Sequence, residues 1–319
     1  MKGSLAEMDG RRITVEVPAT SANLGAGYDC IGVALDLVNT IDLEVHSRRP
    51  GEVELAVEGE GAGELLPERS NRFVRGVEMA LFRAFDEAPN RTGWRIVMRN
   101  AIPLERGLGS SAAAVVAGLV AGNALAGDPL TTADLLDLAG DIEGHPDNVA
   151  SALLGGFVVA AAVDRRIEAI RFDVPRDLRT VLFIPEVRFR TDEMRAVLPA
   201  RVPLADAVLN LGRVAIGVAG LATGRHDLLR ALTVDRLHER YRARAYPQLP
   251  VLVDAAREAG AIGACLSGAG STVIAFSDSM AVLARVEAAF TAVAADRDLQ
   301  GRIVIVAPQN AGARVVSTA

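Results

Sequence analysis

The segment Ile102–Gly118 constrains the fold of this chain more than any other stretch. It contains Gly107 and Gly109, which lack the Cβ atom that would keep a ligand away from the backbone. Ser110 and Ser111 are typical helix caps, and the alanines that follow are strong helix formers. A glycine-rich loop leading into a helix offers unpaired N–H groups and a positive dipole end to an anion. The segment predicts a phosphate-binding loop, while an ordinary loop-to-helix turn without a ligand stays open at this point.

Two known phosphate loops fit this segment poorly. A Walker loop carries Lys after its last glycine, and here that place holds Ser or Ala. The pattern Gly107-x-Gly109-x-x-Ala112 matches the dinucleotide-binding fingerprint. That fingerprint directly follows a strand, whereas the strand expected at Trp94–Met98 ends well before the glycines and Pro103 intervenes. The sequence therefore disfavours both a P-loop and a Rossmann domain.

Length and composition limit the class of protein. With 319 residues the chain exceeds one typical domain, so two domains are expected, and 50% hydrophobic residues supply a core. A net charge of −6, with acids and bases mixed along the chain, argues against a nucleic-acid partner. Cys30 and Cys265 lack metal-ligand spacing, which is typical of reduced thiols. The first twelve residues lack the apolar core of a signal peptide, and the alanine-rich runs are interrupted before membrane-spanning length, so we expect a cytoplasmic protein without a membrane partner.

Hydrophobic periodicity predicts strands and helices mixed along the chain, with a hairpin that turns at Asp164–Arg166. Such mixing favours an α+β fold over a parallel doubly wound sheet. The expected strands are Ile13–Val17, Ile41–Val45, Val53–Val57, Trp94–Met98, Gly156–Val163, Ile167–Phe172, Thr180–Ile184, Gly263–Leu266, Thr272–Phe276 and a final one at Arg302–Val306. The expected helices are Phe73–Phe85, one from the glycine-rich loop to Leu125, one capped by Thr131 or Thr132 and running to Ile142, one from Val149, and then Asp192–Leu198, Leu204–Leu221, Leu249–Ala259 and Met280–Ala294.

Three loops rich in small residues follow one another in a fixed order. They are PATSANLGAGYD at 18–29, PLERGLGSSAA at 103–113 and LSGAGST at 266–272, here called motifs 1, 2 and 3. The ordered set resembles the three motifs of the GHMP kinases, and the resemblance extends from about Ile13 to Val316. It implies an N-terminal α+β domain with a left-handed β-α-β unit, over 1–175, and a C-terminal ferredoxin-like domain, over 176–319.

Further segments resemble the branch of this family that phosphorylates homoserine. They are EGHPDNVASALLGGF, TDEMRAVLP, LHERYR and the terminal GARVV. Two positions depart from the pattern: Ser271 stands where motif 3 usually has Pro, and Val38 where an aromatic residue is common. Neither removes a group needed for chemistry, although the first affects the loop expected near the phosphates.

The resemblance implies ATP as phosphoryl donor and Mg²⁺ as its metal ion. Ser111 and Glu143 match the family's metal-side hydroxyl and carboxylate, and hard oxygen ligands suit Mg²⁺. From the residues alone, Ser111 is equally a helix cap and Glu143 a solvated helix end. Asn71 corresponds to a residue that faces adenine. The full set expected to bind the nucleotide is Asn71, Pro103, Leu104, Glu105, Arg106, Gly107, Leu108, Gly109, Ser110, Ser111, Ala112, Ala113, Gly268 and Gly270.

The amino-acid substrate that the resemblance implies, L-homoserine, is a zwitterion with a primary alcohol. Asn23 and Asp29 match the positions that hold its polar end. Arg195 and Arg242 are candidates for its carboxylate, because a guanidinium can bind two oxygens in one plane. His145 and Thr191 are further expected contacts. A register error toward the neighbouring arginines stays open, namely Arg190, Arg240 and Arg244.

The catalytic set expected from the resemblance is Asn148, Glu143 and Ser111. Asn148 stands where several relatives have a carboxylate, and a neutral amide cannot take up a proton near pH 7. The neighbouring Asp147 is either a substitute base or a turn residue that bonds its own backbone. We therefore expect catalysis mainly by positioning and electrostatic stabilisation.

Other functions remain compatible with the same motifs. Another small-alcohol kinase of the family, of threonine, shikimate or mevalonate type, is one alternative. A non-catalytic nucleotide-binding module on the same fold is another. A homodimer is compatible with the sequence, which by itself does not decide the oligomeric state.

Overall fold

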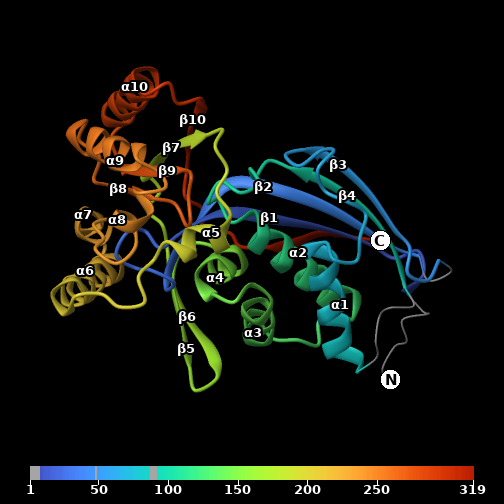
Figure 1. The fold of residues 1–319 in the computed structure, drawn as a ribbon. Helices are drawn as coiled ribbons and strands as arrows, with labels where there is room; N and C mark the ends of the chain where they lie inside the picture. The colour runs from blue at the N-terminus through green and yellow to red at the C-terminus, as the bar shows by residue number, and fades with distance from the viewer. Residues whose placement is uncertain (1–7, 47–48, 87–91) are drawn as a thin grey trace.

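The structure is a computed structural model that describes residues 8–46, 49–86 and 92–319 (Figure 1). Its strands form two sheets in this part of the chain, each covered by helices. The strands are β1 (Arg12–Ala22), β2 (Ile31–His46), β3 (Val53–Gly59), β4 (Gly93–Asn100), β5 (Phe157–Val163), β6 (Arg166–Phe172), β7 (Arg179–Pro185), β8 (Gly263–Leu266), β9 (Val273–Ser277), β10 (Gly301–Val306) and β11 (Arg314–Thr318). The helices are α1 (Arg72–Phe85), α2 (Ser110–Leu125), α3 (Thr132–Glu143), α4 (Pro146–Leu154), α5 (Thr191–Ala196), α6 (Leu204–Thr223), the short 3-10 helix η3 (His226–Leu228), α7 (Leu229–Leu232), α8 (Glu239–Arg242), α9 (Gln248–Glu258) and α10 (Met280–Asp296).

The first sheet has the strand order β11-β1-β2-β4-β3, and the β5–β6 hairpin attaches to β2. All neighbours are antiparallel except β3 and β4, which are parallel with α1 between them in the chain. This β3-α1-β4 arrangement is a β-α-β unit. Helices α1 to α4 lie against one face of the sheet (Figure 1).

Glycines let two of these helices pack at short range. A Cβ at Gly118 of α2 would lie 2.1 Å from the carbonyl oxygen of Phe73 in α1, and one at Gly76 of α1 would lie 2.4 Å from that of Val115 in α2. Because α2 is almost completely buried, it is apolar on nearly all sides rather than on one stripe. The close packing against α1 and the burial of α2 fix the position of its N-terminus relative to the sheet.

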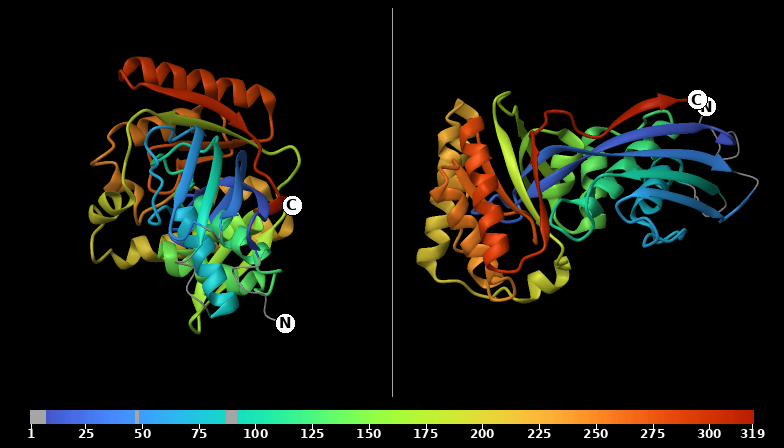
Figure 2. Two further views of the ribbon diagram at one scale, coloured as in Figure 1. Left: turned by 90° about the vertical axis from the view of Figure 1, so that its right-hand side faces the viewer. Right: turned by 90° about the horizontal axis from the view of Figure 1, so that it is seen from above.

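The second sheet has the order β10-β7-β9-β8 and is antiparallel. Along the chain it reads β7, α9, β8, β9, α10, β10, with α5 to α8 inserted before α9. This order and topology confirm the ferredoxin-like prediction. Helices α9 and α10 pack on one side of the sheet, at the end of the molecule away from β3 (Figure 2).

The chain's last strand corrects one prediction. Arg302–Val306 was expected to be the final strand, but β11 follows it and pairs with β1 in the first sheet. The last strand of the chain therefore belongs to the N-terminal sheet, although it lies within the predicted second domain. The boundary between residues 175 and 176 falls in the connection from β6 to β7 and stays a prediction.

Three local predictions also differ from the structure. β1 continues through Pro18–Ala22, which was expected to be loop, because these residues pair with β2. α4 begins at Pro146 rather than at Val149, since proline is favoured in the first turn of a helix. The cap of α2 is Gly109 rather than a serine, and no side chain caps that helix. Of the two predicted caps of α3, Thr131 is the one observed, and it forms a capping box with Asp134. The hairpin at 164–166 was predicted correctly.

Helix α6 differs from the others in its exposure. Of the described helices it is the one that is long and apolar enough to cross a membrane by length and composition, contrary to the expectation that no run reaches that length. Only 22% of its most apolar window is buried in the protein. One such helix is weak evidence for a membrane span.

Candidate active site

The three motifs predicted from the sequence meet in space. The backbone N–H of Thr20 in motif 1 donates to the carbonyl of Leu108 in motif 2 (3.1 Å). The N–H of Gly268 in motif 3 donates to the carbonyl of Ala22 (3.0 Å), and the N–H of Thr272 donates to the carbonyl of Arg106 (3.0 Å). Backbone hydrogen bonds therefore join each motif to another at one place between the sheets.

A cavity of about 550 Å³ lies at this junction. It is lined by most of the predicted site residues together with several that the sequence did not single out. The predicted ones are Asn23, Asp29, Glu105, Gly107, Leu108, Gly109, Ser110, Ser111, Ala112, Glu143, His145, Asn148, Thr191, Arg195, Arg242, Gly268 and Gly270.

The two glycines of motif 2 are required by the protein around them. A Cβ at Gly107 would lie 2.1 Å from the carbonyl oxygen of Ser267 in motif 3, and one at Gly109 would lie 1.9 Å from Oγ1 of Thr20. Both glycines also have positive φ, 74° and 70°. The expectation that these glycines only make room for a ligand is therefore incomplete, because their first role is to let the motifs touch.

The start of α2 is open to a ligand. Gly109 precedes the helix and brings no side-chain hydrogen bond, so the expectation that Ser110 or Ser111 caps it was wrong. The first N–H groups of any helix have no partner within the helix, and the positive end of its dipole lies there. Oγ of Ser111 instead donates to Oε1 of Glu143 (2.7 Å), and Arg72 lies 3.5 Å from the same oxygen. Two oxygens on α2 and α3 thus face one cavity.

A charged pair lies in the same cavity. Nη2 and Nη1 of Arg195 donate to the two carboxylate oxygens of Asp29 (2.7 and 2.9 Å), and Nη1 also donates to the hydroxyl of Tyr28 (2.8 Å). This hydrogen-bonded carboxylate raises the pKa of Arg195 above its ordinary value. The residues predicted to bind the two ends of a zwitterion therefore bind each other in this structure.

The three candidate arginines in and after α8 have different surroundings. Arg242 is buried and lines the cavity. Arg240 instead pairs with Asp206 (2.9 Å), and Arg244 lies over the ring of Tyr241. Arg195 of α5 and Arg190, the residue before that helix, both line the cavity, but Arg190 is mostly exposed and pairs with Asp192.

The N-cap and the first turn of α4 form a compact polar cluster. Oδ1 of Asp147 lies 2.9 Å from Nδ1 of His145 and accepts the backbone N–H of Asn148 (2.7 Å). The hydrogen bond to Asp147 raises the pKa of His145 against the opposing effect of burial. The amide oxygen of Asn148 accepts a hydrogen bond from Thr20 (2.7 Å). Asp147 is thus a buried partner of His145 and lines the cavity, rather than bonding only its own backbone.

A second cavity, of about 460 Å³, adjoins the first and shares Arg72, Glu105, Ser110 and Ser111 with it. Two predicted nucleotide residues, Asn71 and Leu104, line it. The Asn71 side chain also caps α1 by accepting the N–H of Phe73 (2.9 Å).

Three predicted nucleotide residues line neither cavity. They are Pro103, Arg106 and Ala113. Arg106 points away because its guanidinium donates to the carbonyls of Pro185 and Glu186 (2.6 Å each). Ala113 is fully buried on the inner side of α2.

The sequence did not single out several residues that surround these cavities. Arg72 and Phe189 line the first cavity. Tyr28 and Thr20 form hydrogen bonds with two of its lining residues, Arg195 and Asn148. Arg72 directly follows the predicted Asn71, which was the one local signal for it. Thr20 and Tyr28 lie within motif 1, but they and Phe189 come together with the other site residues only because distant segments meet.

Comparisons with known proteins find relatives over nearly the whole chain. The family model described as GHMP kinases N terminal domain matches residues 71–156, and the one described as GHMP kinases C terminal matches 218–296. A homoserine kinase of Moorella thermoacetica is 42% identical over 302 residues, which cover 95% of this chain and 99% of that protein. A homoserine kinase of Carboxydothermus hydrogenoformans is 39% identical, covering 94% and 96%. The crystal structure of homoserine kinase from Cytophaga hutchinsonii superposes with a TM-score of 0.84 at 28% identity, covering 96% of this chain and 97% of that one.

Proposed function

Because the chain belongs to the GHMP kinase family, we propose that it transfers the γ-phosphoryl group of ATP to the hydroxyl of L-homoserine. The product, O-phospho-L-homoserine, is an intermediate of threonine biosynthesis. One observation carries this substrate: Asp29, Arg195 and Arg242 line the same cavity as the glycine-rich loop. L-Homoserine brings an ammonium group for the carboxylate and a carboxylate for the guanidinium groups, next to the alcohol that accepts the phosphoryl group.

The residues present support catalysis by positioning. The unpaired N–H groups at the start of α2 and its dipole stabilise charge that develops on the transferred phosphoryl group. Phosphoryl transfer passes through a loose transition state, in which the attacking oxygen has formed only a weak bond. The rate therefore depends little on a general base. Asn148, beside the start of this helix, orients the acceptor through its amide, and the acceptor's proton leaves late, to phosphate or water.

Magnesium fits the donor set of Ser111 and Glu143. Their side-chain oxygens lie 2.7 Å apart and line the cavity, and Mg²⁺ prefers a few hard protein oxygens together with phosphate oxygens and water. In the part of the chain that the structure describes, no cluster of three or more His, Cys, Asp or Glu offers an all-protein metal site. When bound, the ion supplies charge neutralisation at the phosphates.

Two alternatives fit this cavity less well. A mevalonate-type acid lacks an ammonium group, so Asp29 would repel its carboxylate. A non-catalytic nucleotide-binding module would not need both metal-side oxygens of Ser111 and Glu143 facing one cavity.

A coupled assay of ADP release tests the proposal over a panel of L-homoserine, L-threonine, L-serine, shikimate and mevalonate. We expect the highest kcat/KM with L-homoserine, by about 10- to 100-fold over L-threonine and L-serine, because these carry the same ammonium and carboxylate but hold the hydroxyl one carbon closer to them, away from the position of attack. An equal or higher kcat/KM with shikimate or mevalonate would contradict the substrate. No ADP release with any acceptor would favour a binding module.

We further infer a cytoplasmic homodimer, without nucleic-acid or membrane partner, joined through α6. The exposed apolar residues Leu204, Val208 and Leu211 follow one another at four- and three-residue spacing on that helix. None of the exposed side chains of α6, which the structure describes throughout, is charged, so an identical helix can pack on it without an unpaired charge. On its other side α6 packs into the protein, where Asn210 is buried. A membrane-spanning helix has no need of such a polar anchor.

Sedimentation tests this interface. Leu211→Glu should shift the protein to monomers, whereas Ile170→Glu, at an equally exposed position on β6, should not. A monomeric parent protein, or a dimer that both variants retain, would show that α6 is not a dimer interface.

A further inference from the structure

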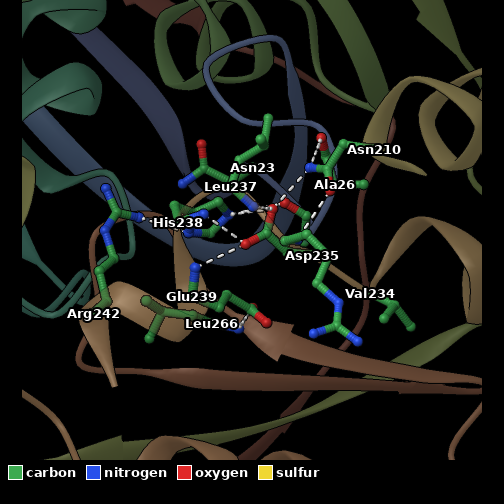
Figure 3. Close-up of polar contacts among 12 residues, drawn as sticks. Asn23, Ala26, Asn210, Val234, Asp235, Leu237, His238, Glu239, Arg242 and Leu266 are labelled. Carbon is green, nitrogen blue, oxygen red and sulfur yellow. Dashed lines mark hydrogen bonds and ion pairs between the residues drawn. The ribbon is translucent and has the colours of Figure 1, made fainter. Parts of the chain in front are cut away.

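Behind the wall that carries Arg242 lies a buried network of polar side chains (Figure 3). It joins Asn210 of α6, Asp235, His238 and Arg242, all nine-tenths or more buried. Apart from Arg242, none of these was assigned a role from the sequence. Buried polar groups are costly unless they are hydrogen-bonded, so the arrangement of this network restricts what each member can do.

Asp235 is the fixed end of the network. Its carboxylate accepts the N–H groups of Leu237, His238 and Glu239 at 2.7–2.9 Å and the side-chain amide of Asn210 at 2.8 Å. These donors satisfy a buried carboxylate and hold the turn that starts α8. His238 is thereby held in place by the backbone that Asp235 binds.

The contacts of His238 determine where its proton lies. Nε2 is 2.8 Å from the carbonyl oxygen of Gly25 in motif 1, and a carbonyl only accepts, so Nε2 carries the hydrogen. Nδ1 is 3.1 Å from Nη1 of Arg242, and a guanidinium only donates, so Nδ1 presents a lone pair. The imidazole is therefore neutral and held as a single tautomer.

The charged surroundings agree with a neutral ring. Burial lowers the pKa of His238 to about 4, and Arg242 acts in the same direction, while Asp235 and Asp29 oppose it. The phenol ring of Tyr28 packs on the imidazole with 5.2 Å between centroids, and Glu239 follows it on α8. Near neutral pH the ring therefore remains an acceptor toward Arg242.

The contacts of Arg242 show what this acceptor achieves. Nε donates to the carbonyl of Met194 (3.3 Å), and Nη1 donates to the carbonyl of Gly268 in motif 3 (2.9 Å) as well as to His238. Among the described residues no hydrogen-bond partner is found for Nη2, and Arg242 lines the cavity. The three acceptors that the buried guanidinium binds are neutral. Asp29 and Asp235 act on it only through their charge, without a hydrogen bond to it, so the guanidinium remains available to a ligand. A carboxylate in the place of His238 would instead neutralise it.

We propose that His238 is a positioning residue, whose neutral imidazole holds the guanidinium of Arg242 in the orientation that presents Nη2 to the substrate carboxylate. It also ties Arg242 to motif 1 through Gly25, so that the carboxylate-binding group and the loop carrying Asp29 keep a fixed relative position. The proposal rests on the proposed function, in which Arg242 binds the carboxylate of L-homoserine.

A pair of matched substitutions separates the two hydrogen bonds of the ring. The amide of Asn reaches the position of Nδ1, and the amide of Gln reaches that of Nε2. His238→Asn therefore keeps an acceptor for Arg242 and loses the bond to Gly25, whereas His238→Gln keeps a donor for Gly25 and loses the acceptor. We expect His238→Gln to raise the KM for L-homoserine by about 10- to 100-fold, with the KM for ATP and kcat within about threefold of the parent. We expect His238→Asn to stay within about fivefold of the parent KM.

Equal increases in both variants, or no increase in His238→Gln, would overturn the proposal, as would an equal rise in the KM for ATP. A parent enzyme that does not phosphorylate L-homoserine would be a failure of the proposed function and not of the network. The tautomer is tested separately on the unmodified protein by long-range ¹H–¹⁵N NMR, which resolves each of the four histidine rings. A neutral, Nε2-protonated ring at pH 7 supports the proposal even if His238→Gln does not fold. An Nδ1-protonated or doubly protonated ring overturns it.

Discussion

At the level of single residues, the groups proposed to bind the amino acid are paired with each other. Asp29 and Arg195 form a two-pronged ion pair, with side chains about one-third exposed. Exposed or half-exposed pairs of this kind contribute little to stability, about 0–1 kcal/mol. A zwitterion that offers an ammonium to one partner and a carboxylate to the other can therefore replace the pair at small cost.

Replacing Asp29 by Asn tests this exchange. The KM for L-homoserine should rise by about 10- to 150-fold, which corresponds to about 1.5–3 kcal/mol for a charge-assisted hydrogen bond, while the KM for ATP changes little. Asp192→Asn is a matched control, because Asp192 lines the same cavity but pairs with Arg190. If Asp29→Asn weakens both substrates equally, or neither, Asp29 is structural.

Replacing Asp147 by Asn tests the absence of a catalytic base. A general base contributes about 10²–10⁴-fold, and we expect a fall in kcat well below that range because Asp147 is occupied by His145 and Asn148. The main effect should be on pH dependence. The raised pKa of His145 keeps its imidazole positive to higher pH. Because His145 is an expected contact of the substrate, whose carboxylate a positive imidazole attracts, the KM for L-homoserine should rise as pH passes through this pKa. In Asp147→Asn the same rise in KM should occur at lower pH.

The measurement is kcat and KM from pH 6 to 9 with ATP saturating. A thousandfold loss of kcat, together with the disappearance of an acidic limb, would identify a carboxylate base at this turn. Asp141→Asn, on α3 and outside this cavity, controls for the loss of one negative charge.

At the level of elements, the loop before α2 is shaped by the loops that it touches. Gly109 lies against Thr20 of β1, and Gly107 against Ser267 and Gly270 of motif 3. The loop can thus place the start of α2 at the cavity only while both neighbours are in position. A side chain at Gly109 should therefore disturb the fold as well as ATP binding.

Gly109→Ala and Gly127→Ala separate these two effects. Both glycines have positive φ, 70° and 84°, but a Cβ at Gly127 meets nothing within 4 Å. In Gly127→Ala the left-handed backbone conformation should lower the free energy of unfolding by only about 1–2 kcal/mol. The ATP kinetics of this variant should stay unchanged. Gly109→Ala should lose more free energy of unfolding in urea and most turnover. Similar stability and activity in the two variants would mean that the contact with Thr20 is easily relieved.

At the level of the whole molecule, strand pairing and ion pairs join the two halves of the protein in addition to the covalent connection between the sheets. After β10 of the second sheet the chain returns to the first sheet, where β11 pairs with β1 and Arg314 pairs with Glu16. Glu64 before α1 pairs with Arg188 after β7, and Glu60 pairs with Arg302 of β10. Because the cavity lies between the sheets, we expect its geometry to depend on global stability.

One buried group makes that stability depend on pH. Burial raises the pKa of Glu239 to about 8, against the backbone N–H of Leu266 that its carboxylate accepts at 2.7 Å. The unfolded chain releases this proton near pH 4.5 and the folded chain only near 8, so the group's contribution is full below 4.5 and is lost as pH rises to 8. The slope is at most about 1.4 kcal/mol per pH unit.

Glu239→Gln mimics the protonated side chain and removes this titration. Its free energy of unfolding, measured in urea, should rise relative to that of the parent between pH 5 and pH 8. A constant difference between the two proteins over that range would show that Glu239 does not titrate there. Glu258→Gln, at the end of α9, serves as the control.

The sequence by itself determined most of the strands and helices in their order, the three motifs and most residues of the cavity, although it missed β11 and the short helices α7 and α8. These depend on local causes: apolar spacing along Phe73–Phe85, the capping box at Thr131, and the turn of the β5–β6 hairpin. The resemblance carried by the motifs also predicted the ferredoxin-like order of the second sheet, which simple periodicity does not contain.

Only the tertiary structure decided which strands are neighbours and which side chains face the cavity. β3 pairs with β4 rather than with β2, and β11 returns to β1, because strand partners are set by packing between segments far apart in the chain. Arg240, Arg242 and Arg244 share one sequence context, but Arg240 and Arg242 lie about 200° apart around α8, at 3.6 residues per turn, and Arg244 follows the helix. Burial against His238 and Gly268 selects Arg242 from the three, and no local pattern contains that choice.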